Sequence, residues 1–370
     1  MMMAMMKVDV YRIPMSAPDD VSGLKSLLDA GKIDPQNITA VIGKTEGNGG
    51  VNDFTRGFAI FSICTLLSER LGIDKEQLVD KVAFNFSGGC EGVMSPHMTV
   101  FVKRKVTGRE TGHQRLAIGV AFTRNFLPEE IGTMVQVRET AKAVREAMKD
   151  AEVENPKDVH FVQVKGPLLT SESARDAKKR GKQVVTTETY LSMGYSNSAS
   201  ALGVALALGE CTESQLSQEI IQKETGGGIR SEVGTSSSGW EKRKCDVVVL
   251  GNSSKSISDL VIGHGVMKDC IDPNGAKEAL RSAGLKFECC PTSKDLEKVV
   301  AVFAKGWQDV ETWTVRGRRI TIPTDTDFGT RMDRAVENAV IASVIGDPMI
   351  WVSGAPDFHQ GGLVATIVRA

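Results

Sequence analysis

Ile38-Thr-Ala-Val-Ile-Gly-Lys44 is an apolar run that ends in lysine, and two variants of it occur further along the chain. They are Val159-His-Phe-Val-Gln-Val-Lys165 and Val299-Val-Ala-Val-Phe-Ala-Lys305. Each is followed by a helical pattern and then by a second apolar run that ends in serine. The serine runs are Ala83-Phe-Asn-Phe-Ser87-Gly88, Val233-Gly-Thr-Ser-Ser237-Ser238 and Met349-Ile-Trp-Val-Ser353-Gly354. Short apolar runs rich in β-branched and aromatic residues predict buried strands. The sequence therefore predicts three copies of one structural unit.

The helix between the two strands of each copy is predicted from its ends. Serine or threonine caps the free amides of a first turn, and glycine adopts the left-handed conformation that ends a helix. The predicted starts are Thr55-Arg56, Ser196-Asn197 and Thr330-Arg331, and the predicted ends are Leu71-Gly72, Leu208-Gly209 and Ile345-Gly346. A strand and a helix also open each copy, and a further apolar strand closes it.

These elements predict an α/β fold of three structurally equivalent α+β units around a pseudo-threefold axis. Each unit would hold a mixed sheet with helices on one face. We place the units at residues 1–104, 113–251 and 257–370, because polar stretches lie between them. The alternative is a chance likeness between βα segments of an ordinary doubly wound domain. Since three markers recur in the same order three times, we favour the repeat.

Composition excludes several classes of protein. The 370 residues include 45 Lys and Arg against 46 Asp and Glu, so neither nucleic acid nor an anionic membrane is an expected partner. The longest run of small apolar residues, 199–208, is about half as long as a membrane span. The seven cysteines have no framework spacing, and the first residues do not form a signal peptide. We therefore expect a cytoplasmic protein.

The polar ends of the repeated strands are the candidate functional residues. In a threefold arrangement Lys44, Lys165 and Lys305 would meet Ser87, Ser237 and Ser353 at one central point. A serine hydroxyl becomes a nucleophile when a base takes its proton, and a neutral lysine can serve. Its pKa must then fall by about three units from ~10.4, which corresponds to about 4 kcal/mol. The glycines beside the serines, Gly88-Gly89, Gly239 and Gly354, would let backbone amides come close to a ligand carbonyl and hold an oxyanion.

The second unit differs from the other two. Arg56 and Arg331 begin their predicted helices, where a carbonyl or anion is favoured, but the second helix begins with Asn197. Ser238 stands where the other units have Gly88 and Gly354. Because an asymmetric reaction on a near-symmetric ligand needs one carbonyl treated differently, this unit is our candidate for the chemistry. Residues 43–50 are rich in glycine but lack the order of a phosphate-binding loop, so nucleotide binding is not favoured.

Long motifs of this chain resemble the cyclic amide (ring-opening) hydrolases. They are Gly43-Lys-Thr-Glu-Gly-Asn-Gly-Gly-Val-Asn-Asp-Phe-Thr-Arg-Gly57 and Ser87-Gly-Gly-Cys-Glu-Gly-Val-Met-Ser-Pro-His97, and the likeness continues at 200–210, 315–319 and 346–354. The resemblance implies three equivalent domains around one site with three Ser–Lys pairs. It implies that Ser237 attacks the substrate and that Lys165 activates it. The remaining ring carbonyls would be held by Lys44, Arg56, Ser87, Gly88, Asn197, Ser238, Lys305, Arg331, Ser353 and Gly354.

Two features depart from the family pattern. Asn197 stands where the family has arginine, so one substrate clamp is missing or replaced. The tail at residues 355–362 is altered and shorter, although the resemblance implies a structural Mg²⁺ or Ca²⁺ ion there. Glu311, Gln360 and Gly361 are the matching metal ligands. No cofactor is expected for catalysis, and the resemblance implies a homotetramer.

The expected activity is an amidohydrolase that opens the ring of a small cyclic imide or ureide. Cyanuric acid, hydrolysed to carboxybiuret and then to biuret and CO₂, is the favoured substrate. The alternatives are a barbiturase, which converts barbituric acid to ureidomalonate, and a non-catalytic protein that binds cyclic imides. A missing arginine at position 197 is the observation that favours the last of these.

Overall fold

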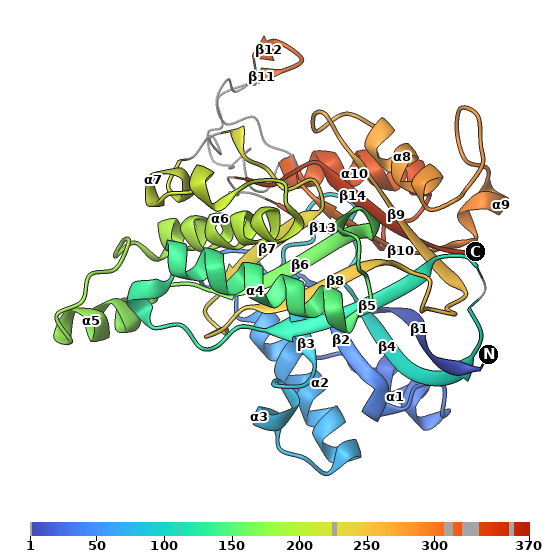
Figure 1. The fold of residues 1–370 in the computed structure, drawn as a ribbon, viewed down its shortest axis with the longest axis horizontal. Helices are drawn as coiled ribbons and strands as arrows, with labels where there is room; N and C mark the ends of the chain where they lie inside the picture. Colours follow the sequence, from blue (N-terminus) through green and yellow to red (C-terminus); the bar gives the residue numbers. More distant parts are fainter. Residues whose placement is uncertain (1, 111, 224–227, 307–313, 320–332, 355–358) are drawn as a thin grey trace.

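A computed structural model describes residues 2–110, 112–223, 228–306, 314–319, 333–354 and 359–370. Three four-stranded sheets occupy its centre, with helices around them (Figure 1). The first unit contains β1 (Met3–Pro14), α1 (Ser22–Asp29), β2 (Ile38–Thr45), α2 (Thr55–Leu71), α3 (Lys75–Leu78), β3 (Ala83–Gly88) and β4 (His97–Gly108).

The second and third units repeat this order with additions. The second contains β5 (Arg115–Phe122), α4 (Met134–Asp150), β6 (Val159–Pro167), α5 (Ser171–Lys179), α6 (Thr189–Leu208), α7 (Gln218–Ile221), β7 (Gly234–Gly239) and β8 (Asp246–Ser253). The third contains β9 (Leu260–Val266), α8 (Asn274–Ser282), α9 (Ser293–Leu296), β10 (Val299–Lys305), β11 (Thr314–Val315), β12 (Arg318–Arg319), α10 (Asp333–Ile345), β13 (Trp351–Ser353) and β14 (Leu363–Arg369).

The three sheets share one topology. Their strand orders are β1-β4-β2-β3, β5-β8-β6-β7 and β9-β14-β10-β13. In each sheet the strand that ends in lysine lies between the closing strand, to which it is antiparallel, and the serine strand, to which it is parallel. The predicted fold class, three equivalent units with mixed sheets, is confirmed. The bounds predicted for the units as separate domains stay a prediction.

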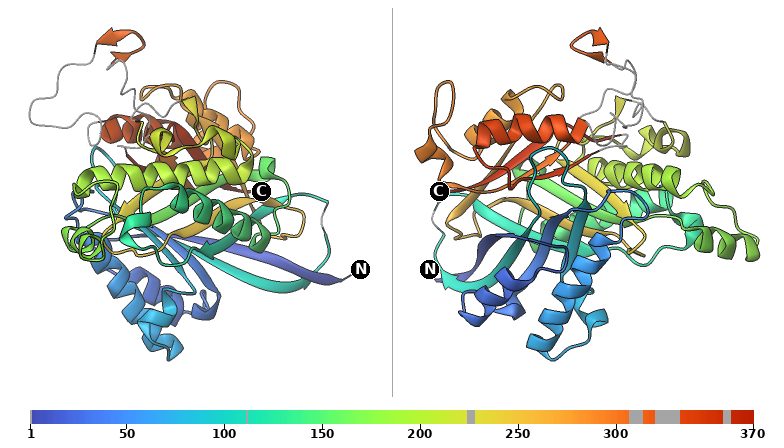
Figure 2. Two further views of the ribbon diagram at one scale, coloured as in Figure 1. Left: turned by 60° about the vertical axis from the view of Figure 1, so that its left-hand side comes forward. Right: turned by 180° about the vertical axis from the view of Figure 1, so that it is seen from behind.

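A shared core joins the units. One apolar cluster contains buried residues from all three sheets. At its centre the ring of Phe303 lies 5.0 Å from that of Phe161 and 6.0 Å from that of Phe101, measured between centroids. Trp351 Nε1 donates to the carbonyl oxygen of Gly43 at 3.0 Å and so ties the third unit to the first. The longer helices lie on the outer sides of this core (Figure 2).

The structure corrects the expected start of one helix. Helix α6 begins at Thr189, seven residues before the predicted Ser196, so Asn197 lies inside the helix and not at its N-terminus. The Ser196 hydroxyl does not cap this helix, because it donates to the carbonyl oxygen of Pro167 at 2.6 Å. Strand β4 continues to Gly108, because it pairs with β1 over its whole length.

The predicted helix ends are confirmed. Gly72, Gly209 and Gly346 follow α2, α6 and α10 with φ of 66°, 77° and 75°, the left-handed conformation that favours glycine. The predicted start at Thr330-Arg331 lies outside the described residues. In the part of the chain that the structure describes, no helix combines the length and apolar character needed to cross a membrane.

Candidate active site

The three lysine–serine pairs occupy the same position in the three sheets. Across the parallel strand pairs, Lys44 lies opposite Ser87, Lys165 opposite Ser237, and Lys305 opposite Ser353. All three lysines are buried, with at most 1% of each exposed. Because strands in parallel register end at the same edge of a sheet, each pair is presented at the end of its sheet where the chain leaves both strands.

One cavity of about 50 Å³ brings residues of the three units together. By the same measure a single water needs about 10–15 Å³, so the space suits a small ligand. The predicted residues that line it are Arg56, Ser87, Gly88, Lys165, Asn197, Ser237, Ser238, Ser353 and Gly354. Asn48, Gly49, Gly50, Tyr190, Met193 and Arg334 complete the lining. Asn197 reaches the cavity from the interior of α6, where the sequence had placed a helix start.

Lys44 and Lys305 lie behind the lining and support it. Lys44 Nζ donates to the carbonyl oxygen of Gly88 at 3.2 Å. Lys305 Nζ donates to Ser353 Oγ at 3.5 Å and to the carbonyl oxygen of Gly354 at 3.1 Å. Both lysines therefore hold the Ser-Gly turns that face the cavity.

Arg331 and Glu311 lie outside the described residues. Sequence reasoning did not select Arg334, which lines the cavity from the first turn of α10 as described. Its guanidinium binds both carboxylate oxygens of Glu91, with Nε–Oε2 at 2.6 Å and Nη2–Oε1 at 2.5 Å. The side chain is also buried, with 7% of the residue exposed.

Burial changes the protonation of two of the lysines. It lowers the pKa of Lys165 to about 7, with Arg56 and Lys242 acting in the same direction and Glu241 against it. Burial also lowers the pKa of Lys44 to about 7, assisted by Arg334. A substantial neutral fraction near pH 7 is what a lysine needs to act as a base.

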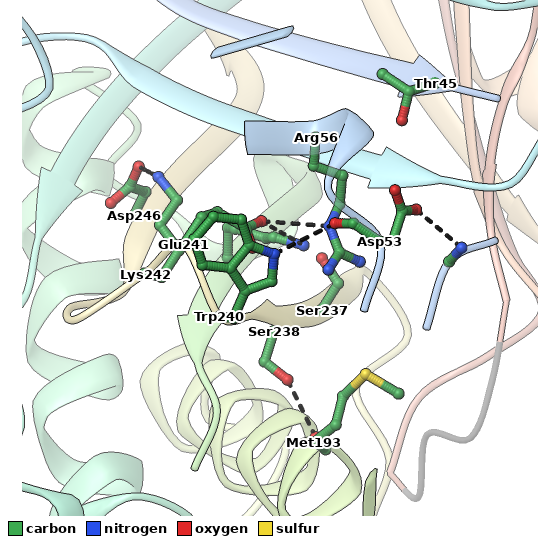
Figure 3. A network of polar contacts seen from close by, with 12 residues as sticks. Thr45, Asp53, Arg56, Met193, Ser237, Ser238, Trp240, Glu241, Lys242 and Asp246 are labelled. Atoms are coloured by element: carbon green, nitrogen blue, oxygen red, sulfur yellow. Dashed lines mark hydrogen bonds and ion pairs between the residues drawn. The ribbon is translucent and has the colours of Figure 1, made fainter. Parts of the chain in front are cut away.

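Glu241 lies between Lys165 and Arg56. Its Oε1 is 3.4 Å from Arg56 Nε (Figure 3). The same oxygen is 3.7 Å from Lys165 Nζ, and the Glu241 side chain is 7% exposed. Glu91 takes the same place in the first unit, since both glutamates follow the strand serine by four residues. That shared spacing was the signal in the sequence that could have identified them.

Ser237 differs from the other two serines in exposure. Ser87 and Ser353 are buried, at 6% and 4% exposed, whereas Ser237 is partly exposed. Ser237 Oγ accepts a hydrogen bond from Gln163 Nε2 at 3.4 Å. Lys165 and Ser237 are strand neighbours, but no hydrogen bond joins Nζ to Oγ in the described part of the chain. Catalytic hydrogen bonds often tighten only when substrate is bound.

Ser236, directly before Ser237, is held by the third unit. Gln360 Nε2 donates to Ser236 Oγ at 2.7 Å, and Gln360 Oε1 accepts from Ser236 N at 2.5 Å. Lys305 Nζ donates to the carbonyl oxygen of Ser236 at 3.2 Å. The Ser236 hydroxyl itself donates to the carbonyl oxygen of Asn197 at 2.7 Å. The backbone that carries Ser237 is therefore fixed from two sides.

The predicted metal ligands do not form a recognisable site among the described residues. The amide oxygen of Gln360 is directed at Ser236 N, and Gly361 lies next to it with φ of 138°. Glu311 lies outside the described residues. Within them, no group of three or more His, Cys, Asp or Glu side chains could hold a metal ion. The structural Mg²⁺ or Ca²⁺ ion stays a prediction.

Comparisons with known proteins agree on the family. Residues 9–369 match the family model described as amidohydrolase ring-opening protein. A cyanuric acid amidohydrolase of Enterobacter cloacae is 48% identical over 372 residues, covering 98% of this chain and 100% of the relative. A cyclic amide hydrolase of Azorhizobium caulinodans is 46% identical, covering 99% and 100%.

Solved structures give the same result. A cyanuric acid hydrolase, presented as an evolutionary innovation by structural concatenation, superposes with a TM-score of 0.92 at 43% identity, covering 99% of this chain and 100% of that one. A cyanuric acid hydrolase from A. caulinodans superposes with a TM-score of 0.87 at 42% identity, with the same coverage. Three repeated sheets, a central cavity with paired lysines and serines, and these matches over the full chain lead to one conclusion: the protein belongs to the ring-opening amidohydrolase family.

Proposed function

We propose that this protein hydrolyses a ring C–N bond of a small cyclic imide or ureide, and that cyanuric acid is its substrate. The product would be carboxybiuret, which loses CO₂ to give biuret. The observation that carries the proposal is the small cavity bordered by the three serines. A ring with three carbonyls alternating with three N–H groups matches three similar walls. The names of the relatives at 44–48% identity favour the same substrate.

Ser237 is the proposed nucleophile and Lys165 the proposed base. Neutral Lys165 takes the hydroxyl proton while Ser237 Oγ forms a bond to one ring carbonyl carbon. The ring C–N bond then breaks, and the lysine returns its proton to the leaving nitrogen. Water attacks the resulting ester, again with Lys165 as base, and frees Ser237. The pKa of about 7 for Lys165 and the partial exposure of Ser237 support these roles.

The other two walls would hold the carbonyls that do not react. Ser87 with Gly88 and Ser353 with Gly354 present hydroxyl and backbone amide donors, and Arg56 adds a buried cation. Donors fixed in advance stabilise developing negative charge without having to reorganise. A role for Arg331 in holding a ring carbonyl, expected from its place at the start of the third predicted helix, stays a prediction.

Turnover by purified Ser237→Ala tests the assignment. We expect at least about a thousandfold loss in kcat, as for the nucleophiles of other covalent catalytic groups. Ser353→Ala is the matched control, because Ser353 has the same strand position but is buried behind a direct bond from Lys305. It should retain far more activity. If Ser237→Ala keeps most of its activity, the proposed role is wrong.

Two alternatives lead to different measurements. Barbituric acid replaces one ring N–H by CH₂, and a side-by-side assay of both compounds identifies a barbiturase. A non-catalytic binder would be stabilised thermally by cyanuric acid without releasing CO₂.

Assembly as a homotetramer and a cytoplasmic location stay predictions, and light scattering on the purified protein tests the first.

A further inference from the structure

Glu241 is a buried carboxylate at the junction of the first two units. Besides the ion pairs to Arg56 and Lys165, neither of its oxygens accepts a hydrogen bond from another residue in the described part of the chain. Arg56 Nε likewise has no hydrogen-bond partner among those residues. Buried charges without hydrogen bonds are costly, so a carboxylate held in this way beside a cavity is a candidate for a functional role.

The segment that carries Glu241 is anchored to the first unit. Trp240 Nε1 donates to the carbonyl oxygen of Asp53 at 3.3 Å (Figure 3). The Trp240 ring also packs edge-on against that of Phe54, at 5.3 Å between centroids. At Gly239, a Cβ atom would lie 2.1 Å from Glu241 Oε2, so only glycine allows the carboxylate to turn back beneath the chain. The position of Glu241 is therefore built by contacts on both sides of the unit junction.

Glu91 provides an internal comparison. It follows Ser87 at the same spacing and also binds an arginine from another unit, but it does so through two short hydrogen bonds to Arg334. Glu241 binds its arginine more loosely and is shared with the lysine beside the proposed nucleophile. The glutamate at this position thus forms a bidentate pair with an arginine in the first unit, whereas in the second unit it forms ion pairs with both an arginine and the lysine.

We propose that Glu241 is a positioning residue that couples the base to the substrate clamp: its carboxylate holds the ammonium form of Lys165 while orienting Arg56 toward the cavity. The role deepens the proposed function and rests on it for the identity of the base. When Lys165 accepts the Ser237 proton, the new ammonium lies beside a carboxylate that needs no rearrangement. The same carboxylate keeps Arg56 extended, with its Nη2 donating to the carbonyl oxygen of Gly50 at 3.2 Å.

The charges around Lys165 determine in which direction its pKa should change when the charge of Glu241 is removed. Glu241 and Asp53 favour its charged form, whereas burial, Arg56 and Lys242 oppose it. Lys165 and Arg56 in turn keep the pKa of Glu241 below its usual range although burial acts to raise it, so this carboxyl is ionised. Removing the negative charge should therefore make Lys165 lose its proton at lower pH.

Glu241→Gln, which keeps the shape and removes the charge, tests the proposal against Glu91→Gln. Two readouts are measured from pH 5 to 9, with folding checked by thermal melting. One is kcat/KM with cyanuric acid. The other is carbamylation of Lys165 by cyanate, followed by peptide mass spectrometry, which reports the neutral amine without any turnover.

In Glu241→Gln we expect both midpoints to fall by at least about one pH unit, since a charge 3.7 Å away has been removed. In Glu91→Gln both midpoints stay in place while KM rises. Glu241→Asp, which keeps the charge, should titrate closer to the unchanged protein than Glu241→Gln does, and it serves alone if Glu241→Gln does not fold.

Midpoints that coincide in Glu241→Gln and the unchanged protein, or Glu241→Asp titrating like Glu241→Gln, overturn the proposal. A shifted cyanate midpoint in a protein that hydrolyses no cyclic imide would instead contradict the proposed function and leave the link between Glu241 and Lys165 intact. Normal turnover without a shift in either midpoint would contradict the link between Glu241 and Lys165 and leave the proposed function intact.

Discussion

The first and second units present the same lysine and serine in the same strand register but surround them with different neighbours. Lys44 donates to the carbonyl oxygen of Gly88, and the nearby Glu91 is fully engaged by Arg334. Lys165 instead faces Glu241, and its serine is partly exposed to the cavity. The pKa of both lysines falls to about 7, so burial alone does not distinguish them. In a near-symmetric site, the second layer of side chains is what makes one pair different.

Replacing Lys44 and Lys165 in turn by methionine should give the largest difference in activity between the first and second units. Methionine keeps most of the buried length without the amine, so the core is disturbed little. We expect Lys165→Met to lose at least about a hundredfold in kcat, because a general base is removed. Lys44→Met should lose about tenfold or less, because Lys44 only supports a turn. Steady-state kinetics decides, and equal losses would break the distinction between the two units.

Lys44 and Lys165 should contribute equally to the pH dependence of the free energy of unfolding. The pKa of each is about 7 in the folded protein and about 10.5 when unfolded, so the unfolded chain binds more protons between these values. Stability therefore rises with pH across this window, by about 1.4 kcal/mol per pH unit for each lysine.

Urea unfolding of the unchanged protein and of Lys165→Met between pH 7.5 and 9.5, values inside that window, measures this effect. The free energy of unfolding should rise more steeply with pH in the unchanged protein than in Lys165→Met, because the variant has lost one of the two lysines that take up a proton on unfolding. Lys44→Met should behave like Lys165→Met. Parallel curves would show that the folded protein does not hold these lysines at a lowered pKa.

The support behind the proposed nucleophile gives a smaller test. The residue before Ser237 is Ser236, held by Gln360, whereas the residue before Ser87 is Phe86, which packs in the core of the first unit. Gln360→Met removes the hydrogen bonds that Gln360 makes to the backbone N–H, the carbonyl oxygen and the hydroxyl of Ser236, the residue before Ser237. We expect kcat to fall about tenfold with little change in KM, because small displacements of reacting atoms slow the chemistry. Unchanged kcat would mean that β7 holds Ser237 without the third unit.

Patterns within a few residues were sufficient to predict the repeated strands and the ends of the main helix of each unit. The apolar runs before Lys44, Lys165 and Lys305 predicted the central strands, and Gly72, Gly209 and Gly346 predicted the helix ends. The start of α6 was missed because Ser196 has the residue type of a cap but bonds to Pro167 in another element. A side chain that finds a distant partner carries no local signal of it.

The residues of the site were likewise predicted only in part. Nine of them line the cavity, since threefold repetition places equivalent strand ends at a common point. Arg334 and Glu241 were not predicted, because their importance depends on pairs made between units. Only the spacing that Glu91 shares with Glu241 was visible in the chain, and spacing alone does not tell which cation a carboxylate meets.

The sequence by itself determined that this protein has three similar units whose strands end in lysine and serine, because hydrophobic periodicity and helix caps act over short distances along the chain. Only the tertiary structure decided that Glu241 stands between Lys165 and Arg56, and that Gln360 holds the backbone beside Ser237. The contacts of Glu241 with Arg56 and of Gln360 with Ser236 join residues of different units, and their geometry is set by how the three sheets pack around a shared core.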